Sequence, residues 1–168
     1  CHAAMPESGA DPIVAAAQLI MALQTIPSRR LSPQESAVVS ITQINGGEAI
    51  NVLPDKVVLR GTFRCLSNRV RERVKGLIAH YVSTQPQVSD VQGSIAWYPG
   101  YPVTKNHRAE ALKVREAAVA VLGEAAVSGQ IAPSMASEDF ACMLEACPGA
   151  YFWIGTDGET PSKPLHNA

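Results

Sequence analysis

The stretch "AVVSITQINGGEAINVLPDKVVLRGTFRC", residues 37–65, decides the fold that we expect for this chain of 168 residues. In its second half, small or apolar residues occupy alternate positions: Val57, Leu59, Gly61, Phe63 and Cys65. A period of two residues is typical of a strand that buries one face. The stretch therefore predicts strands at residues 37–44 and 56–65, joined by a connection longer than a tight hairpin needs.

Helices are expected on both sides of these strands. Asp11 followed by Pro12 is typical of an N-cap with proline at the first helical position, and it predicts a helix that ends before Pro27. "SNRVRERVKGLIAHYV" (67–82) has apolar residues at a helical period, and "DVQGSIAWY" (90–98) alternates like a strand. The order α-β-β-α-β is that of a ferredoxin-like βαββαβ unit without its first strand. The sequence thus predicts an α+β fold and a chain truncated at its start.

A domain boundary is expected at "YPGYPVTKN" (98–106), where two prolines and a glycine interrupt the pattern. Beyond it the sequence predicts a helix capped by Asn106 and ending at Gly123, a short helix that starts at Ser137, and a strand "AYFWIG" (150–155). We expect one domain before this stretch and a second segment of about sixty residues after it. The second segment is too thin to hold a core of its own.

The composition excludes several functional classes. Hydrophobic residues make up 46% of the chain, charged residues 17%, and the net charge is −1. That balance is ordinary for a globular protein and offers no basic surface for nucleic acid or an anionic membrane. The longest apolar stretch is too short to span a bilayer. Four cysteines are few for a disulfide scaffold, which favours a reducing, cytoplasmic location.

Two histidines near the chain ends are candidate functional residues. His166 follows "PL" in a polar tail; it is either a terminal histidine without a functional role or a ligand of a metal such as Zn²⁺. His2 precedes the first helix; it is either a solvent-exposed loop histidine or a donor to a developing oxyanion. Spacing alone leaves both alternatives open.

Four further polar residues have a structural and a functional interpretation. Asn51 suits an Asx-type turn before Pro54 or a contact with substrate. Arg64 suits a solvated strand edge or bidentate binding of a carboxylate. Ser137 and Glu138, in "SEDF", suit a helix start, and that structural account is sufficient without any role in a site.

Several motifs together resemble one enzyme family. "HAAMPESGADPIVAAAQLIMALQTI" (2–26), "VVSITQINGGEAINVLPDKVVLRGTFR" (38–64), "PSMASEDF" (133–140), "PGAYFWIGT" (148–156) and "PLHN" (164–167) stand in the order and approximate spacing of that family. It is the metal-dependent amidohydrolase and peptidase family of hippurate hydrolase, N-acyl-amino-acid amidohydrolases and auxin-conjugate hydrolases. The resemblance covers only the later part of such an enzyme. Cys1 and Ala136 stand where the family usually has glycine.

The resemblance implies a domain organisation and a role for each candidate residue. Residues 1–102 would be a ferredoxin-like lid or dimerisation domain, and 103–168 the C-terminal piece of an α/β two-metal hydrolase domain. His166 would bind one of two divalent ions, Zn or Mn, and His2 would polarise the scissile carbonyl, typically in the partner subunit. Asn51 and Arg64 would place the substrate carboxylate, and Ser137 and Glu138 would line the metal pocket.

The implied function is hydrolysis of N-acyl amino acids, such as hippurate-like amides, by a homodimer with metal-activated water. The family's other metal ligands and its general-base glutamate would lie upstream, so we expect this chain alone to be inactive and to retain no metal. The alternative is a non-enzymatic ferredoxin-like module for dimerisation or interaction, whose open sheet edge favours self-association. An RNA-binding module is disfavoured because Phe63 is the single aromatic residue of its strand.

Overall fold

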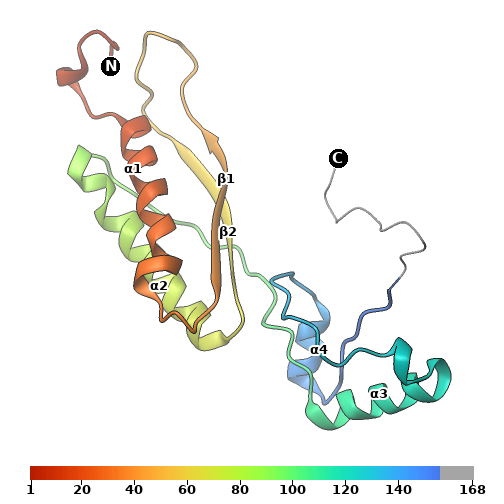
Figure 1. Ribbon diagram of the computed structural model, residues 1–168. Coiled ribbons are helices and arrows are strands. Elements are labelled where there is room, and N and C mark those ends of the chain that lie inside the picture. The colour runs from red at the N-terminus through yellow and green to blue at the C-terminus, as the bar shows by residue number, and fades with distance from the viewer. Residues whose placement is uncertain (156–168) are drawn as a thin grey trace. The chain divides into compact units, whose positions relative to one another are not determined.

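The structure is a computed structural model that describes residues 1–155, and it contains two compact units. The first unit comprises Cys1–Val103 and Ala132–Ser137. Within the described residues, the second comprises Thr104–Ile131 and residues 138–155. Figure 1 labels the main helices and strands of both units. The chain is thus a mixed α/β protein, and the sheet of the described residues lies in the first unit.

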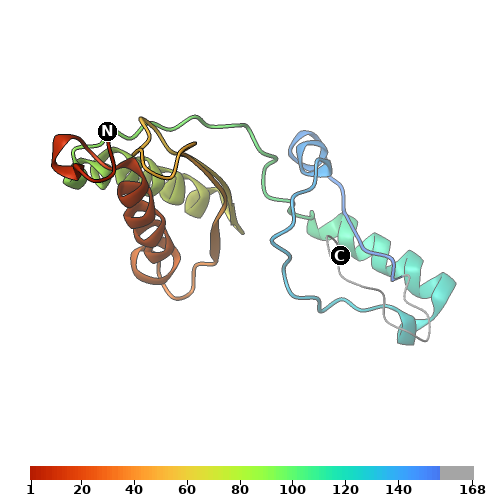
Figure 2. The same ribbon diagram turned by 90° about the horizontal axis from the view of Figure 1, so that it is seen from above.

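A two-stranded antiparallel hairpin organises the first unit. β1 (Ala37–Asn45) pairs with β2 (Val58–Cys65), which confirms both strands expected from the sequence. The register slips by one residue between Ile41 and Gln43, so the pairing contains a β-bulge. Two views show both long helices on the same face of this hairpin (Figures 1 and 2).

The two long helices begin where capping chemistry predicts. α1 (Pro12–Thr25) starts after Asp11, whose carboxylate accepts hydrogen bonds from two backbone N–H groups of the first turn at 2.9 and 3.2 Å. α2 (Asn68–Thr84) starts after Ser67, whose hydroxyl accepts a backbone N–H at 3.3 Å. The remaining short elements of the first unit are a π-helical turn and two 3₁₀ turns, Ile26–Arg30, Pro6–Ser8 and Pro86–Ser89.

The core of the first unit lies between the helices and the inner face of the hairpin. Its buried members come from α1, α2, β1 and the turn after α1: Leu19, Leu23, Ile26, Leu31, Val39, Val70, Val74, Ile78 and Val82. Leu59, Phe63 and Cys65 of β2 pack against this cluster. The alternation of β2 therefore identified its buried face correctly. No helix of the described residues has the length and apolarity to cross a membrane.

The strand expected at residues 90–98 is wrong, because the sheet of the described residues has two strands. Alternation reports which side chains are apolar, but a strand also needs a neighbouring backbone to pair with. This segment is held by packing instead. A Cβ added to Gly93 would lie 2.0 Å from the Val82 carbonyl oxygen of α2, and the Trp97 ring meets Phe63 edge-on at 5.8 Å.

The second unit contains α3 (Arg108–Leu122), a 3₁₀ turn (Glu124–Ala126) and α4 (Phe140–Ala146). The C-terminal end of α3 at Gly123 is confirmed, with φ at +84°. Three details of the expectation are wrong. The N-caps are His107 and Asp139 rather than Asn106 and Ser137, and residues 150–155 form no strand. The Asn106 side chain instead binds the backbone of Tyr151.

One carboxylate connects the loop before β1 to α2. Glu35 accepts a hydrogen bond from the Ser32 backbone N–H at 3.1 Å, and its other oxygen lies 2.5 Å from an Arg69 guanidinium nitrogen. Arg73 adds a weaker ion pair at 3.7 Å. The Ser32 hydrogen bond and then the Arg69 pair hold the pKa of Glu35 below its usual value.

Replacement of Gly93 should reveal the close packing of residues 90–98 on α2. We expect Gly93→Ala to destabilise the chain by about 1–3 kcal/mol, because the methyl group would overlap the Val82 carbonyl. The matched control is Gly76→Ala in α2, where a Cβ meets nothing within 4 Å. That change should stabilise by about 0.5–1 kcal/mol through helix propensity. Urea unfolding measures the free energy of unfolding of both variants. Equal changes in the two would contradict the close packing of Gly93 on α2.

Glu35→Gln should lower stability at neutral pH and have little effect in acid. A folded-state pKa below the unfolded value contributes stability above the unfolded pKa, and this contribution is lost as the pH falls through the folded pKa. Thermal unfolding of the wild type and of Glu35→Gln from pH 7 down to about pH 3 measures the difference in their stability. A difference that stays constant over this range would show that the ionised carboxylate is not the stabilising form.

Candidate functional site

The N-terminal segment is fastened to the connection between the strands. His2 forms an isolated antiparallel bridge with Val52. The Ala3 N–H donates to the Asn51 carbonyl at 2.9 Å, and the Leu53 N–H donates to the Cys1 carbonyl at 2.8 Å. In this pattern the bridged residues lie directly opposite each other. The structure therefore brings His2 and Asn51, two predicted site residues, to one place.

The imidazole of His2 is held by its own backbone. Its Nδ1 accepts a hydrogen bond from the Ala4 N–H at 3.1 Å. A neutral imidazole that accepts at Nδ1 carries its proton on Nε2. His2 is exposed, so Nε2–H is available as a donor. This tautomer is the one that a carbonyl-polarising histidine needs.

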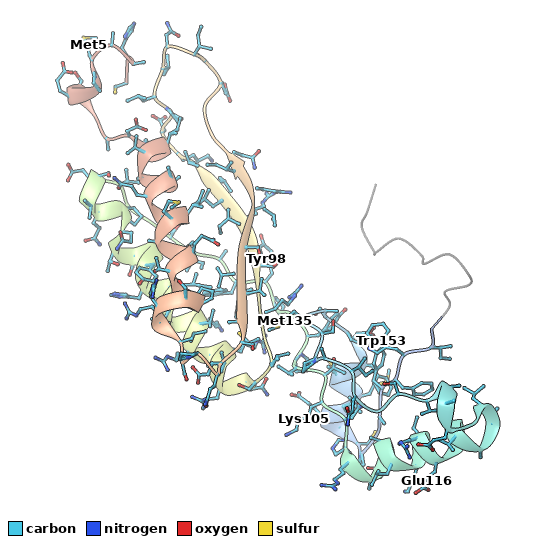
Figure 3. All side chains as sticks on the ribbon, viewed as in Figure 1. Met5, Tyr98, Lys105, Glu116, Met135 and Trp153 are labelled. Carbon is cyan, nitrogen blue, oxygen red and sulfur yellow. The ribbon has the colours of Figure 1, made fainter. Side chains whose placement is uncertain are left out.

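Asn51 lies at the tip of a turn in the connection between the strands. The Val52 N–H donates to the Ala49 carbonyl at 3.5 Å, which makes Ile50 and Asn51 the two central residues of the turn. Ile50 is 106% exposed, Met5 51% and Val52 48%. Met5, labelled in Figure 3, belongs to the same N-terminal segment. The sequence motifs predict Asn51 as a site residue, and that role stays a prediction, whereas the exposed apolar residues of the two paired segments were not among the candidates.

Arg64 is not part of this cluster within one chain. It pairs with Val38 near the end of β2, whereas the connection with Asn51 leaves the hairpin at the opposite end, next to Val58. Arg64 is six residue steps along the strand from Val58, which corresponds to about 20 Å. Arg60 lies nearer to the connection. It donates to Gln43 at 3.4 Å and lines a shallow depression of about 690 Å³ with Thr42, Ile44, Asn45 and Val58.

Glu138 of the second unit has a defined partner. Its Oε2 accepts a hydrogen bond from the Tyr151 hydroxyl at 3.1 Å. Burial, and then this hydrogen bond, raise the pKa of Tyr151 above its usual value, because the carboxylate disfavours a phenolate beside it. Ser137 is exposed, belongs to the first unit and caps no helix.

The described residues do not form a metal site by themselves. Between residues 1 and 155 there is no group of three or more His, Cys, Asp or Glu side chains that could hold a metal ion. His166, the predicted metal ligand, lies outside the described residues. A metal centre of the complete protein would therefore need ligands beyond this part of the chain.

Hydrogen exchange should report the ladder that places His2 beside Asn51. We expect the amides of Ala3 and Leu53 to exchange slowly, because each donates to a backbone carbonyl. The Gly47 amide, which finds no acceptor among the described residues, is the internal control. Exchange resolved by NMR would contradict the ladder if all three amides exchanged at the same rate.

Comparison with known proteins shows where these features recur. Residues 1–89 match the peptidase dimerisation domain family. The chain is 41% identical to N-acetyl-L-cysteine deacetylase of Bacillus subtilis (strain 168), covering 94% of this chain and 37% of the relative. It is 35% identical to hippurate hydrolase of Campylobacter jejuni, covering 99% and 43%.

A crystal structure gives the same result at the level of the fold. The dinuclear metal binding peptidase of the M20 family from Bacillus subtilis superimposes with a TM-score of 0.74 at 31% identity, over 96% of this chain and 40% of that one. The chain thus spans about two fifths of the length of these relatives. Because the dimerisation family matches more than half of its residues, the chain belongs to the M20 family of metal-dependent amidohydrolases and peptidases.

Proposed function

We propose that the complete protein containing this chain is an amidohydrolase that cleaves N-acyl amino acids, including hippurate-like amides. The observation that carries the proposal is the fastening of His2 to the turn of Asn51, with Nδ1 occupied and Nε2–H available. A fixed N–H donor lowers the barrier of acyl transfer when it faces the oxygen on which negative charge develops. The resemblance to a deacetylase and to hippurate hydrolase supports an amide as the substrate.

The proposal assigns the remaining candidate residues around the same substrate. Asn51 and Arg64 bind its carboxylate end, and Ser137 and Glu138 line the pocket. His166 supplies one ligand to a pair of divalent ions, Zn or Mn, whose other ligands lie outside this chain. We propose that residues 1–102 are a ferredoxin-like lid and that 103–168 return to the hydrolase domain.

A homodimer is the proposed assembly, and the first unit offers a surface for it. α1 buries one side but exposes Ile13, Val14 and Met21, which are 43%, 47% and 70% accessible. Beside α1, β1 pairs with β2 alone among the described residues and leaves one backbone edge open. An exposed apolar helix face next to an open strand edge favours association with a second copy.

Dimerisation also accommodates the distance between Arg64 and Asn51. Arg64 lies about 20 Å along β2 from Val58, the end of the hairpin at which the connection with Asn51 leaves, and a substrate of amino-acid size is shorter than this stretch of strand. A second copy that pairs through β1 brings its own hairpin and turn. We propose that His2 and Asn51 of one subunit act on a substrate held in the other.

The alternative is a dimerisation module without activity, which the same exposed surface of α1 supports. It differs from the hydrolase in one measurable respect, because a scaffold needs neither His2 nor His166. The four cysteines are free thiols, which supports a reducing, cytoplasmic location for either alternative.

Removal of the His2 donor should reduce turnover in the full-length protein. We expect His2→Gln to lower kcat for hippurate about 10²–10³-fold with a small change in KM, as for loss of one oxyanion donor. His80→Gln, at an exposed position of α2, is the matched control and should retain full activity. Unchanged kcat in the His2 variant would overturn its assignment, and an inactive wild-type protein would favour the scaffold.

A charge on the exposed face of α1 should weaken the dimer. We expect Met21→Glu to shift the protein from dimer to monomer in sedimentation velocity, because the carboxylate would be buried between subunits. Tyr98→Glu, which adds the same charge at a residue that is 89% exposed outside α1 and β1, should leave the dimer intact. A Met21 variant that stays dimeric would place the interface elsewhere.

A further inference from the structure

Four hydrogen bonds fix residues 149–151 against the start of α3. The Asn106 amide donates to the Tyr151 carbonyl and accepts from the Tyr151 N–H, both at 2.8 Å. The His107 N–H donates to the Gly149 carbonyl at 3.0 Å, and the Gly149 N–H donates to Nδ1 of His107 at 3.2 Å. These side chains pair with a distant backbone and cap no helix. Both polar groups of the Tyr151 backbone, the N–H and the carbonyl, are therefore hydrogen-bonded to Asn106.

Aromatic contacts fix the ring of Tyr151 as well. Its centroid lies 5.8 Å from that of Phe140 and 5.2 Å from that of Trp153, the latter edge-on at 90°. Trp153 is labelled in Figure 3. The Trp153 contact is edge-to-face and the Phe140 contact is tilted, and aromatic pairs at these distances are favourable and restrict the ring orientation. With the backbone and ring both fixed, the Tyr151 hydroxyl becomes a donor in a set position, and Glu138 accepts from it at 3.1 Å.

We propose that Tyr151 is a positioning residue that orients the Glu138 carboxylate toward the substrate, and that Asn106 holds Tyr151 for this purpose. The inference rests on the proposed function, in which Glu138 lines the pocket. Glu138 precedes α4 and has three side-chain torsions to fix. An ionised carboxylate only accepts hydrogen bonds. With Oε2 occupied by Tyr151, Oε1 remains to accept from an N–H group of the substrate amide.

A double-mutant cycle in the full-length protein separates positioning from a purely structural role. Tyr151→Phe removes the hydroxyl and keeps the ring, and should lower kcat/KM for hippurate about tenfold, the size expected for a hydrogen bond to a charged group. In a Glu138→Gln background the same change should have no further effect. Tyr98→Phe is the matched control and should change nothing. Equal losses in both backgrounds would overturn the proposal.

Phenol titration by ultraviolet absorbance provides a readout that does not depend on activity. Glu138 and Asp139 are the charged groups that raise the pKa of Tyr151, together with its burial. The titration step of Tyr151 is identified by its absence from the Tyr151→Phe variant. Glu138→Gln should therefore lower the pKa of that step. An unchanged titration would show that the two groups do not interact and would overturn the inference. Full activity of Glu138→Gln would also overturn it while leaving the hydrolase intact, whereas an inactive wild type would overturn the proposed function itself.

Discussion

Burial of one face of a two-stranded hairpin under two helices is the constraint on which the first unit depends. A hairpin alone is marginal in water, so β1 and β2 persist because Val39, Leu59 and Phe63 are covered by α1 and α2. Once this face is buried, the register is fixed, since a slip by one residue would expose every buried side chain. The connection at the end of the hairpin is then presented in a defined place, where the His2 segment pairs with it.

The candidate site depends on backbone pairing more than on side chains. Two main-chain hydrogen bonds bring His2 beside the Asn51 turn, and a third, from Ala4, selects the tautomer of the imidazole. Arg64 belongs to the same hairpin but lies at its other end. The proposed second copy of the chain would account both for this separation and for the exposed apolar residues of α1. Assembly and catalysis are thus parts of one proposal.

Local patterns predicted the elements of the fold well and the long-range pairings poorly. The Asp11 cap, the apolar period of residues 67–82 and the alternation of β2 are local patterns, and the structure agrees with each of them. Residues 90–98 and 150–155 were expected as strands because their apolar pattern fits, but a ladder needs a partner that no local pattern specifies. For the same reason the local sequence favours Asn106 as a helix cap, although its amide binds Tyr151. The family motifs predict roles for His2, Asn51 and Glu138 that stay predictions, whereas the pairing of the His2 segment with the Asn51 turn and the tyrosine beside Glu138 required coordinates.

The most direct test of this account is a crystal structure of the full-length protein with an N-acyl amino acid analogue bound. The decisive quantity is the distance from Nε2 of His2 to the carbonyl oxygen of the analogue. We predict about 2.7–3.1 Å, measured to the analogue in the active site of the partner subunit. An imidazole beyond hydrogen-bond reach of that oxygen in every subunit would contradict the central claim that this segment polarises the scissile amide.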